Sequence, residues 1–250
     1  MAKQFLLYDT IALMIKEDNI KKAQAIYRAG LENNERSLNL IRELLACNVT
    51  DYIVKAGKDW LYFDVSLAME YFKKNKDIDG MYHAGIYWKN FDYQCGINQI
   101  LEWDNDEYIF RAGRFWKQFD YERGLARLIE LHSSKYIYHA GLDWKSFDNK
   151  RGFEALLNIQ DPEYIFYAGM HWDYFDYVKA SDVLIKIGNC ECIYKAGCQW
   201  KWFDYKHGWQ ILERNVIEGR KWRGKALENE RWKKGLKEIW ECLKKNVNKI

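Results

Sequence analysis

A row of aspartates recurs along the sequence and is the first pattern that could carry chemistry. Each aspartate follows a phenylalanine, and successive members are 28 residues apart: Asp64, Asp92, Asp120, Asp148, Asp176 and Asp204. Carboxylates can act as general acids and bases in hydrolytic enzymes. A short polar side chain directly before an apolar helical segment is also what a helix N-cap requires. We interpret the row as N-caps, because capping explains both its position and its regularity.

The cysteines form a second candidate site, this one for a metal. Cys190, Cys192 and Cys198 lie close together, and His207 follows. Regular zinc sites show paired Cys-x2-Cys spacing, which this cluster lacks, and the three cysteines do not share one face of a helix. The sequence also contains no phosphate-binding loop, glycine-rich dinucleotide turn, H-E-x-x-H motif or nucleophile elbow. We therefore expect no metal, no cofactor and no enzymatic activity.

A third pattern is a basic column, counted from the glycine (position 0) of a recurring Ala-Gly dipeptide. Position −2 is basic in six of seven cases: Arg28, Lys55, His83, Arg111, His139, Tyr167 and Lys195. On a helix, positions −5, +1 and +2 share this face. They add mainly aromatic side chains: Tyr52, Tyr108, Tyr136, Tyr164, Arg114, Tyr87, Phe115 and His171. We call these fifteen residues the ridge.

Aromatic rings beside cations suit two kinds of partner. They stack on the bases and neutralise the phosphates of single-stranded nucleic acid. Tyrosine, tryptophan and arginine are also enriched at the energetic centres of protein interfaces. The alternative is that the ridge is the solvated face of a helix, with its tyrosines packed sideways against the next repeat. The sequence leaves these interpretations open.

The elements that position these residues follow from a tandem repeat. The Ala-Gly glycines are 27 and then 28 residues apart: Gly30, Gly57, Gly85, Gly113, Gly141, Gly169 and Gly197. A tryptophan stands three residues after each glycine from the second onward: Trp60, Trp88, Trp116, Trp144, Trp172 and Trp200. Such periods indicate stacked supersecondary units.

Each repeat is predicted to be a hairpin of two helices. Position −8 supplies N-caps for the first helix: Asp77, Asn105, Ser133, Asp161 and Asn189. Positions −4, −1, 0 and +3 fall on one face of that helix, which gives a buried stripe with a small-residue notch. A glycine costs about 1 kcal/mol inside a helix relative to alanine. We therefore expect close helix contact there, with the indole of one helix over the Ala-Gly notch of a neighbour.

Both ends of the chain depart from the repeat. We divide the chain into N-terminal capping helices with a divergent first repeat (1–49), tandem repeats (50–213) and basic C-terminal capping helices (214–250). The first unit has Asn33 where the tryptophan belongs, and Trp232, Leu236, Ile239, Trp240 and Leu243 recur at helical spacing near the end. The last segment carries twelve Lys or Arg against five Glu, or +7, so the remainder of the +3 chain is about 3 − 7 = −4. This basic tail could contact nucleic acid or an acidic partner, or be a solvated helix face.

Asp161-Pro162-Glu163 at the start of a first helix, and a Leu-Ile pair late in second helices, resemble short HEAT-like repeats. The resemblance covers the architecture of residues 50–213 and brings no catalytic residue with it. It implies an all-α solenoid of about six two-helix repeats. No stretch of the sequence has the length and apolarity of a membrane span. Residues 1–10 lack the basic, apolar and small-residue order of a signal peptide, so we expect none. Six cysteines without a disulfide pattern favour the cytoplasm.

These observations predict a non-catalytic binding scaffold, an adaptor or inhibitor, that grips a protein partner through the ridge. Extended α-solenoid surfaces are used mostly in this way. The alternative is binding of single-stranded RNA or DNA along the same ridge, although a mildly acidic array is a poor footprint for nucleic acid. No membrane partner is expected.

Overall fold

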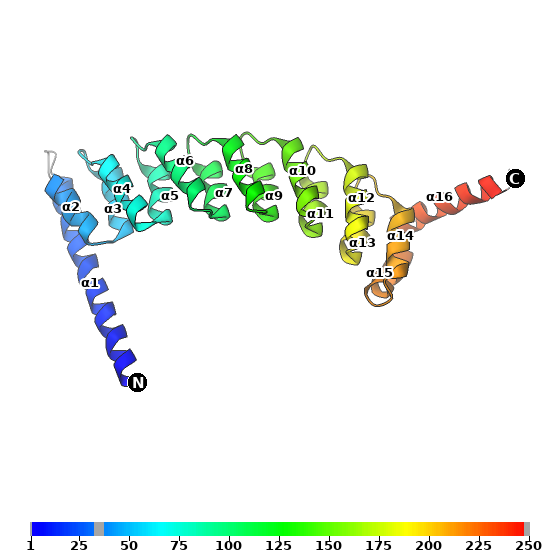
Figure 1. The fold of residues 1–250 in the computed structure, drawn as a ribbon, viewed down its shortest axis with the longest axis horizontal. Helices are drawn as coiled ribbons and strands as arrows, with labels where there is room; N and C mark the ends of the chain where they lie inside the picture. The colour runs from blue at the N-terminus through cyan, green and yellow to red at the C-terminus, as the bar shows by residue number, and fades with distance from the viewer. Residues whose placement is uncertain (1, 33–37, 248–250) are drawn as a thin grey trace. The chain divides into compact units, whose positions relative to one another are not determined.

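The chain folds into helices connected by short turns. A computed structural model describes the backbone of residues 2–32 and 38–247, and the side chains of residues 13–32, 38–239 and 241. Within these ranges there are sixteen α-helices and no strand (Figure 1). The all-α fold class is thereby confirmed, and the packing of helices against their neighbours in sequence is that of an α-solenoid. Asn33 lies outside the described residues, as do the side chains of Trp240 and Leu243.

The helices form two compact units, residues 1–120 and residues 121–250. The first unit contains α1 (Ala2–Glu32), α2 (Leu38–Ala46), α3 (Thr50–Asp59), α4 (Val65–Asn75), α5 (Ile78–Tyr87), α6 (Tyr93–Glu102) and α7 (Asp106–Phe115). The second contains α8 (Tyr121–Glu130), α9 (Ser134–Asp143), α10 (Asn149–Ile159), α11 (Pro162–His171), α12 (Tyr177–Ile187), α13 (Cys190–Gln199), α14 (Tyr205–Arg214), α15 (Glu218–Glu228) and α16 (Glu230–Val247).

The first helices of the repeats are α3, α5, α7, α9, α11 and α13, and the helix after each is its second helix. Within a unit each first helix packs on the first helix of the next repeat, as α3 does on α5 and α11 on α13. No described helix is both long and apolar enough to cross a membrane.

Aspartate and asparagine side chains start most of these helices. Before first helices, Asp77 accepts a hydrogen bond from the backbone N–H of Gly80 at 2.8 Å, and Asn189 accepts one from Cys192 at 2.9 Å. Before second helices, the Phe-Asp aspartates do the same at Asp64, Asp92, Asp148, Asp176 and Asp204. The N-cap interpretation is confirmed at these positions. Ser133 occupies the N-cap position of α9, but its side chain makes no capping bond there.

Within each unit, the tryptophan of a repeat covers the glycine of the preceding one, as the notch predicts. A Cβ built on Gly57 would lie 2.3 Å from the ring of Trp88, and one on Gly169 would lie 2.4 Å from Trp200. The indole Nε1 of Trp88 also donates a hydrogen bond of 2.9 Å to the carbonyl of Val54, at position −3. The same bond recurs from Trp60, Trp116, Trp172, Trp200 and Trp232. Position 0 must therefore be glycine, because the indole lies directly against the backbone.

The rest of the Phe-Asp-Tyr motif is also structural. Phe175 packs edge-on against Trp200, with ring centroids 5.2 Å apart. The hydroxyl of Tyr177 donates to the carbonyl of Gly169 at 3.1 Å, and Tyr205 does the same to Gly197 at 2.8 Å. The phenylalanine, aspartate and tyrosine thus pack, cap and tie the second helix to the first helix of the same repeat.

Candidate partner-binding surface

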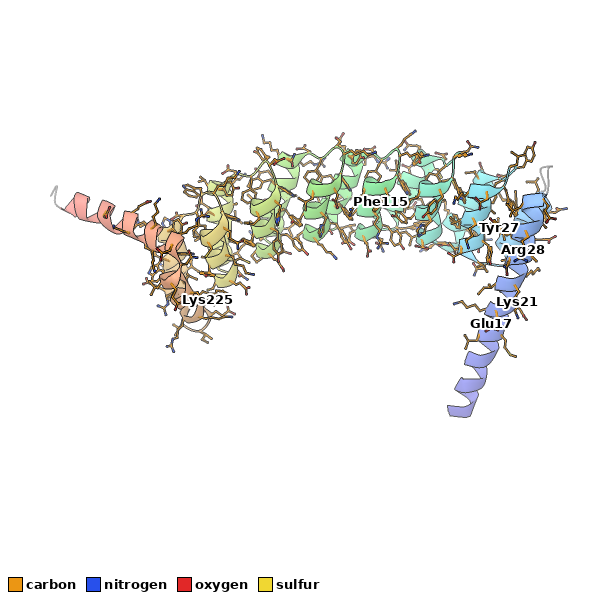
Figure 2. All side chains as sticks on the ribbon, turned by 180° about the vertical axis from the view of Figure 1, so that it is seen from behind. Glu17, Lys21, Tyr27, Arg28, Phe115 and Lys225 are labelled. Carbon is orange, nitrogen blue, oxygen red and sulfur yellow. The ribbon has the colours of Figure 1, made fainter. Side chains whose placement is uncertain are left out.

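The ridge follows the outward face of the first helices within each unit. In the first unit, Arg28 lies on α1 and Lys55 on α3, while His83 and Tyr87 lie on α5. The helix α7 carries four members: Tyr108, Arg111, Arg114 and Phe115 (Figure 2 labels Arg28 and Phe115). In the second unit, Tyr136 and His139 lie on α9, Tyr164, Tyr167 and His171 on α11, and Lys195 on α13. All are at least partly exposed.

An acidic column pairs with the basic column, which the sequence reasoning missed. Position −6 is one helical turn before position −2, and its carboxylates face the cations. Arg111 contacts Glu107 at 2.7 Å and Lys195 contacts Glu191 at 2.7 Å. The hydrogen bond from Lys195 lowers the pKa of Glu191. Such exposed pairs add little stability, but they leave the ridge close to neutral.

His83 and Tyr167 show variants of the same pairing. The Nε2 of His83 lies 3.4 Å from Asp79, and the hydroxyl of Tyr167 donates to Glu163 at 3.1 Å. The signal for this column was present in the sequence, because position −6 is acidic in five of the seven repeats: Asp51, Asp79, Glu107, Glu163 and Glu191.

The tyrosines at position −5 pack sideways against the preceding repeat. The ring of Tyr108 meets that of Tyr82 edge-on, with centroids 5.4 Å apart, and its hydroxyl donates to Asp79 at 2.9 Å. Burial and this hydrogen bond raise the pKa of Tyr108 to about 12. Tyr52 meets Tyr27, and Tyr164 meets Tyr138, in tilted contacts with ring centroids 5.8 Å apart. For these side chains, packing between repeats is the better interpretation.

The most exposed aromatic side chains lie at position +2. Tyr87 is 48% exposed and Phe115 is 53% exposed. The guanidinium of Arg114 lies 5.0 Å from the centre of the Phe115 ring, and the ammonium of Lys58 lies 5.7 Å from that of Tyr87. Position +2 therefore offers flat apolar surfaces that already lie beside cations.

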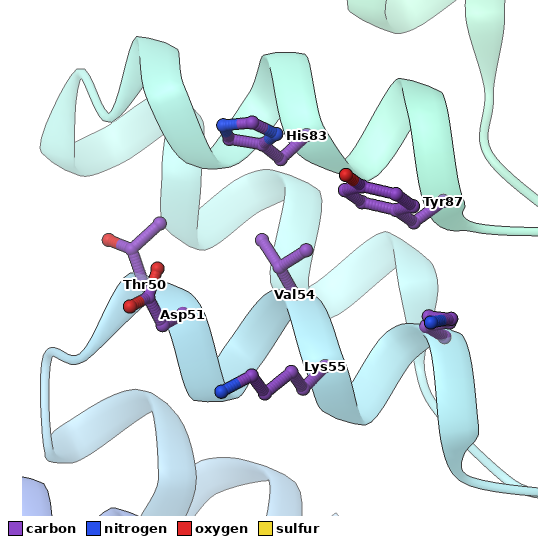
Figure 3. Close-up of a pocket in the computed structure, with 7 residues that line it drawn as sticks. Thr50, Asp51, Val54, Lys55, His83 and Tyr87 are labelled. Atoms are coloured by element: carbon purple, nitrogen blue, oxygen red, sulfur yellow. The ribbon is translucent and has the colours of Figure 1, made fainter.

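A cavity opens in the first unit where α3 and α5 face each other. Its volume is about 340 Å³ (Figure 3). The lining includes three ridge residues and four that sequence reasoning missed: Lys55, His83, Tyr87, Thr50, Asp51, Val54 and Lys58. In the wall of this cavity, Nδ1 of His83 is buried and has no hydrogen-bond partner. The cavity is a concave feature on an otherwise regular face.

The basic tail begins with a lysine-flanked tryptophan. The ammonium groups of Lys221 and Lys225 lie 4.6 and 4.5 Å from the Trp222 ring, which itself lies 5.2 Å from Tyr194 of α13 (Figure 2 labels Lys225). Both lysines also lower the pKa of Glu191, after the larger effect of Lys195. The start of the tail thus continues the polar face of α13.

The described residues contain no group of metal-ligating side chains. Cys190, Cys192 and Cys198 are free thiols, and burial raises the pKa of Cys192 to about 11. A thiol of this kind is a poor nucleophile, because the thiolate is the reactive form.

The chain was compared with protein-family models, curated proteins and solved structures, and no match was found. The class of protein is therefore assigned from the arrangement of its helices. It is a helical repeat protein of the α-solenoid type, with a polar and aromatic surface along its first helices.

Proposed function

We propose that this protein is a non-catalytic binding scaffold, an adaptor or inhibitor, that grips a partner protein through the ridge. The observation that carries the proposal is the exposure of Tyr87 and Phe115 beside cations, on a face whose charges are otherwise balanced. Exposed rings next to arginine or lysine are typical of the centres of protein interfaces.

Binding of single-stranded nucleic acid is less favoured, for an electrostatic reason. Nucleic-acid sites depend on cations that neutralise phosphates. On the ridge, Arg111 and Lys195 are each paired with a carboxylate one helical turn away. A phosphate backbone lying along this face would be repelled by the acidic column as well as attracted by the basic column.

We further propose that the protein acts in the cytoplasm, as its cysteine usage leads us to expect. The repeats are proposed to be HEAT-like in their hairpin geometry. Neither proposal is needed for the test of the ridge.

The test combines a ridge variant with a matched control on the same unit. The double variant Arg111→Glu, Phe115→Ala changes the charge and the exposed ring of α7. The control variant Lys74→Glu makes the same charge change, from +1 to −1, on the exposed side of α4. Proteins crosslinked to the intact chain in the cells that produce it should be lost with the ridge variant and retained with the control. Equal recovery with both variants would contradict the proposal.

The nucleic-acid alternative is tested with purified protein and single-stranded oligonucleotides. A complex dominated by phosphates should weaken steeply between about 50 and 200 mM salt. We expect no measurable binding at the lower concentration. Tight and strongly salt-dependent binding that the ridge variant abolishes would instead assign the ridge to nucleic acid.

A further inference from the structure

The contact between first helices is built around an aromatic ring at position −3. The ring of Tyr138 lies between α9 and α11, with its centroid 5.8 Å from that of Tyr164, 5.9 Å from Tyr167 and 6.1 Å from His171. Its hydroxyl also bonds with Nδ1 of His171 at 2.8 Å. This ring therefore occupies the groove that faces positions −5, −2 and +2 of the next helix.

Position −3 is aromatic in every repeat except one. Its members are Tyr27, Val54, Tyr82, Phe110, Tyr138, Phe166 and Tyr194. The facing position −5 is also small opposite Val54, because Gly80 stands there and packs against Phe72. Both rings that meet in the groove between α9 and α11, Tyr138 and Tyr164, thus have no counterpart between α3 and α5.

The cavity of about 340 Å³ is the space that this substitution leaves. It is lined by Val54 together with His83 and Tyr87, which are positions −2 and +2 of the next helix, as Tyr167 and His171 are for Tyr138. Figure 3 shows Val54 pointing from α3 towards α5, below the rings of His83 and Tyr87. The volume lies at the lower end of the range of about 300–1,000 Å³ found for ligand pockets. The site is therefore large enough to hold one aromatic side chain.

The charges around the cavity indicate what flanks that side chain. Lys55 and Lys58 line it, and neither forms an ion pair with a described residue. Asp51 is the one carboxylate in the lining. It stands one helical turn before Lys55, but seven residues before Lys58, or about 10 Å from it along the helix. The ammonium group of Lys58 near the end of α3, beside the ring of Tyr87, and that of Lys55 one turn earlier have no ion-pair partner among the described residues. They favour acidic residues in whatever binds there.

We propose that this cavity receives an aromatic side chain, flanked by acidic residues, from the partner protein, and that this ring replaces the one missing at position −3. The inference rests on the proposed function and names the anchor through which the partner is held. Interface anchors of this kind are rings that fill a preformed pocket.

The test uses capped tripeptides as probes and the full-length protein. In a nuclear magnetic resonance titration, Glu-Tyr-Glu should shift the methyl signals of Val54 and Thr50, which both line the cavity, in a saturable way. The Thr50 methyl is also the reporter in variants of Val54. Glu-Ala-Glu and Lys-Tyr-Lys should bind at least tenfold more weakly. If Glu-Ala-Glu binds as well as Glu-Tyr-Glu, the ring is irrelevant, and the site takes a simple anion instead.

Two substitutions at one position provide a matched pair. Val54→Tyr restores the aromatic residue of the other repeats and should abolish binding of Glu-Tyr-Glu, while the melting temperature is maintained. Val54→Ala leaves the cavity open and should retain binding. Equal binding by both variants would overturn the proposal. If Val54→Tyr does not fold, Lys58→Glu decides, because it should weaken Glu-Tyr-Glu at least tenfold and leave Lys-Tyr-Lys unimpaired.

The failure of this inference differs from the failure of the proposed function. Suppose that the Arg111→Glu, Phe115→Ala variant loses its crosslinked partners, but no peptide binds at Val54. This result would contradict the proposed aromatic anchor and leave the scaffold proposal intact. Retention of all partners by that variant would contradict the scaffold proposal whatever the peptides do.

Discussion

At the scale of single residues, the glycine at position 0 is the most constrained part of each repeat. Trp200 is fully buried over Gly169, and its Nε1 is bonded to the carbonyl of Phe166, so the indole cannot move aside cheaply. We expect Gly169→Ala to destabilise the protein by about 1–3 kcal/mol, the usual cost of overpacking. The measurement is the free energy of unfolding in urea.

Gly224 is the matched control for this substitution. It also lies within a helix of the second unit, but an added Cβ would meet nothing within 4 Å. Gly224→Ala should therefore stabilise the protein by about 0.5–1 kcal/mol, through helix propensity. Similar effects of the two substitutions would show that the indole does not restrict position 0.

Tyr108 gives a residue-scale prediction for pH. Its pKa is raised to about 12, first by burial and then by the hydrogen bond to Asp79, whereas an unfolded tyrosine titrates near pH 10. The folded state holds the proton more tightly, so this contribution to stability is complete below pH 10 and is lost as the pH rises to 12. Tyr108→Phe should reduce the loss of unfolding free energy across this window.

Asp79→Asn provides the control for that assignment. It removes the carboxylate and leaves the burial, so the pKa of Tyr108 should fall part of the way towards 10. A pH titration of the ring signals of Tyr108 by nuclear magnetic resonance would measure it, because absorbance would sum all 18 tyrosines. An unchanged titration in Asp79→Asn would contradict the role of the hydrogen bond.

At the scale of elements, α16 ends the array by supplying one more tryptophan. Trp232 is fully buried, covers Gly197 and donates to the carbonyl of Tyr194. We expect Trp232→Ala to cost about 3–5 kcal/mol locally. In a solenoid such a loss affects nearest neighbours, so hydrogen exchange should accelerate in α13 and α14 more than in α9 and α10. Trp202→Ala, at a residue 45% exposed, should change little.

The hairpins could be predicted from sequence because local patterns determine them. The Phe-Asp aspartates must cap, and the Ala-Gly notch must receive a large side chain. The role of Trp232 was harder to predict, because it stands 232 − 197 = 35 residues after its glycine, whereas Trp200 stands 200 − 169 = 31 after its own. Trp200 directly follows the end of α13 at Gln199, whereas Trp232 lies within α16, beyond the end of α15 at Glu228.

The candidate site was only partly predictable, for two physical reasons. The basic column was evident, but its neutralisation by residues such as Glu107 depends on which side chains share a helical turn. The cavity exists where Val54 replaces the aromatic residue found at position −3 of the other repeats. This replacement has meaning only once the structure shows that the ring at position −3 fills the groove between first helices. The residues that recur in every repeat therefore serve packing and capping. Positions where one repeat differs from the others are better indicators of function.

At the scale of the whole molecule, one repeat should be removable without loss of the fold. Deletion of residues 162–189 removes α11 and α12 and leaves Asp161 directly before Cys190, so that it can cap α13 as it capped α11. Trp200 would then stand over Gly141, where Trp172 stands in the intact chain. Because 28 of 250 residues are lost, the dependence of the unfolding free energy on urea should fall by roughly one tenth.

Deletion of half a repeat tests the same argument from the other side. Removal of residues 176–189 eliminates α12 and joins α11 to α13 without a second helix between them. The two first helices could then no longer place Trp200 over Gly169, because a second helix is needed to return the chain to the same edge. Circular dichroism and urea unfolding should show a cooperative fold for the 28-residue deletion and its loss for the 14-residue one. If both variants unfolded alike, stability would not be divided among hairpins that contact only their neighbours.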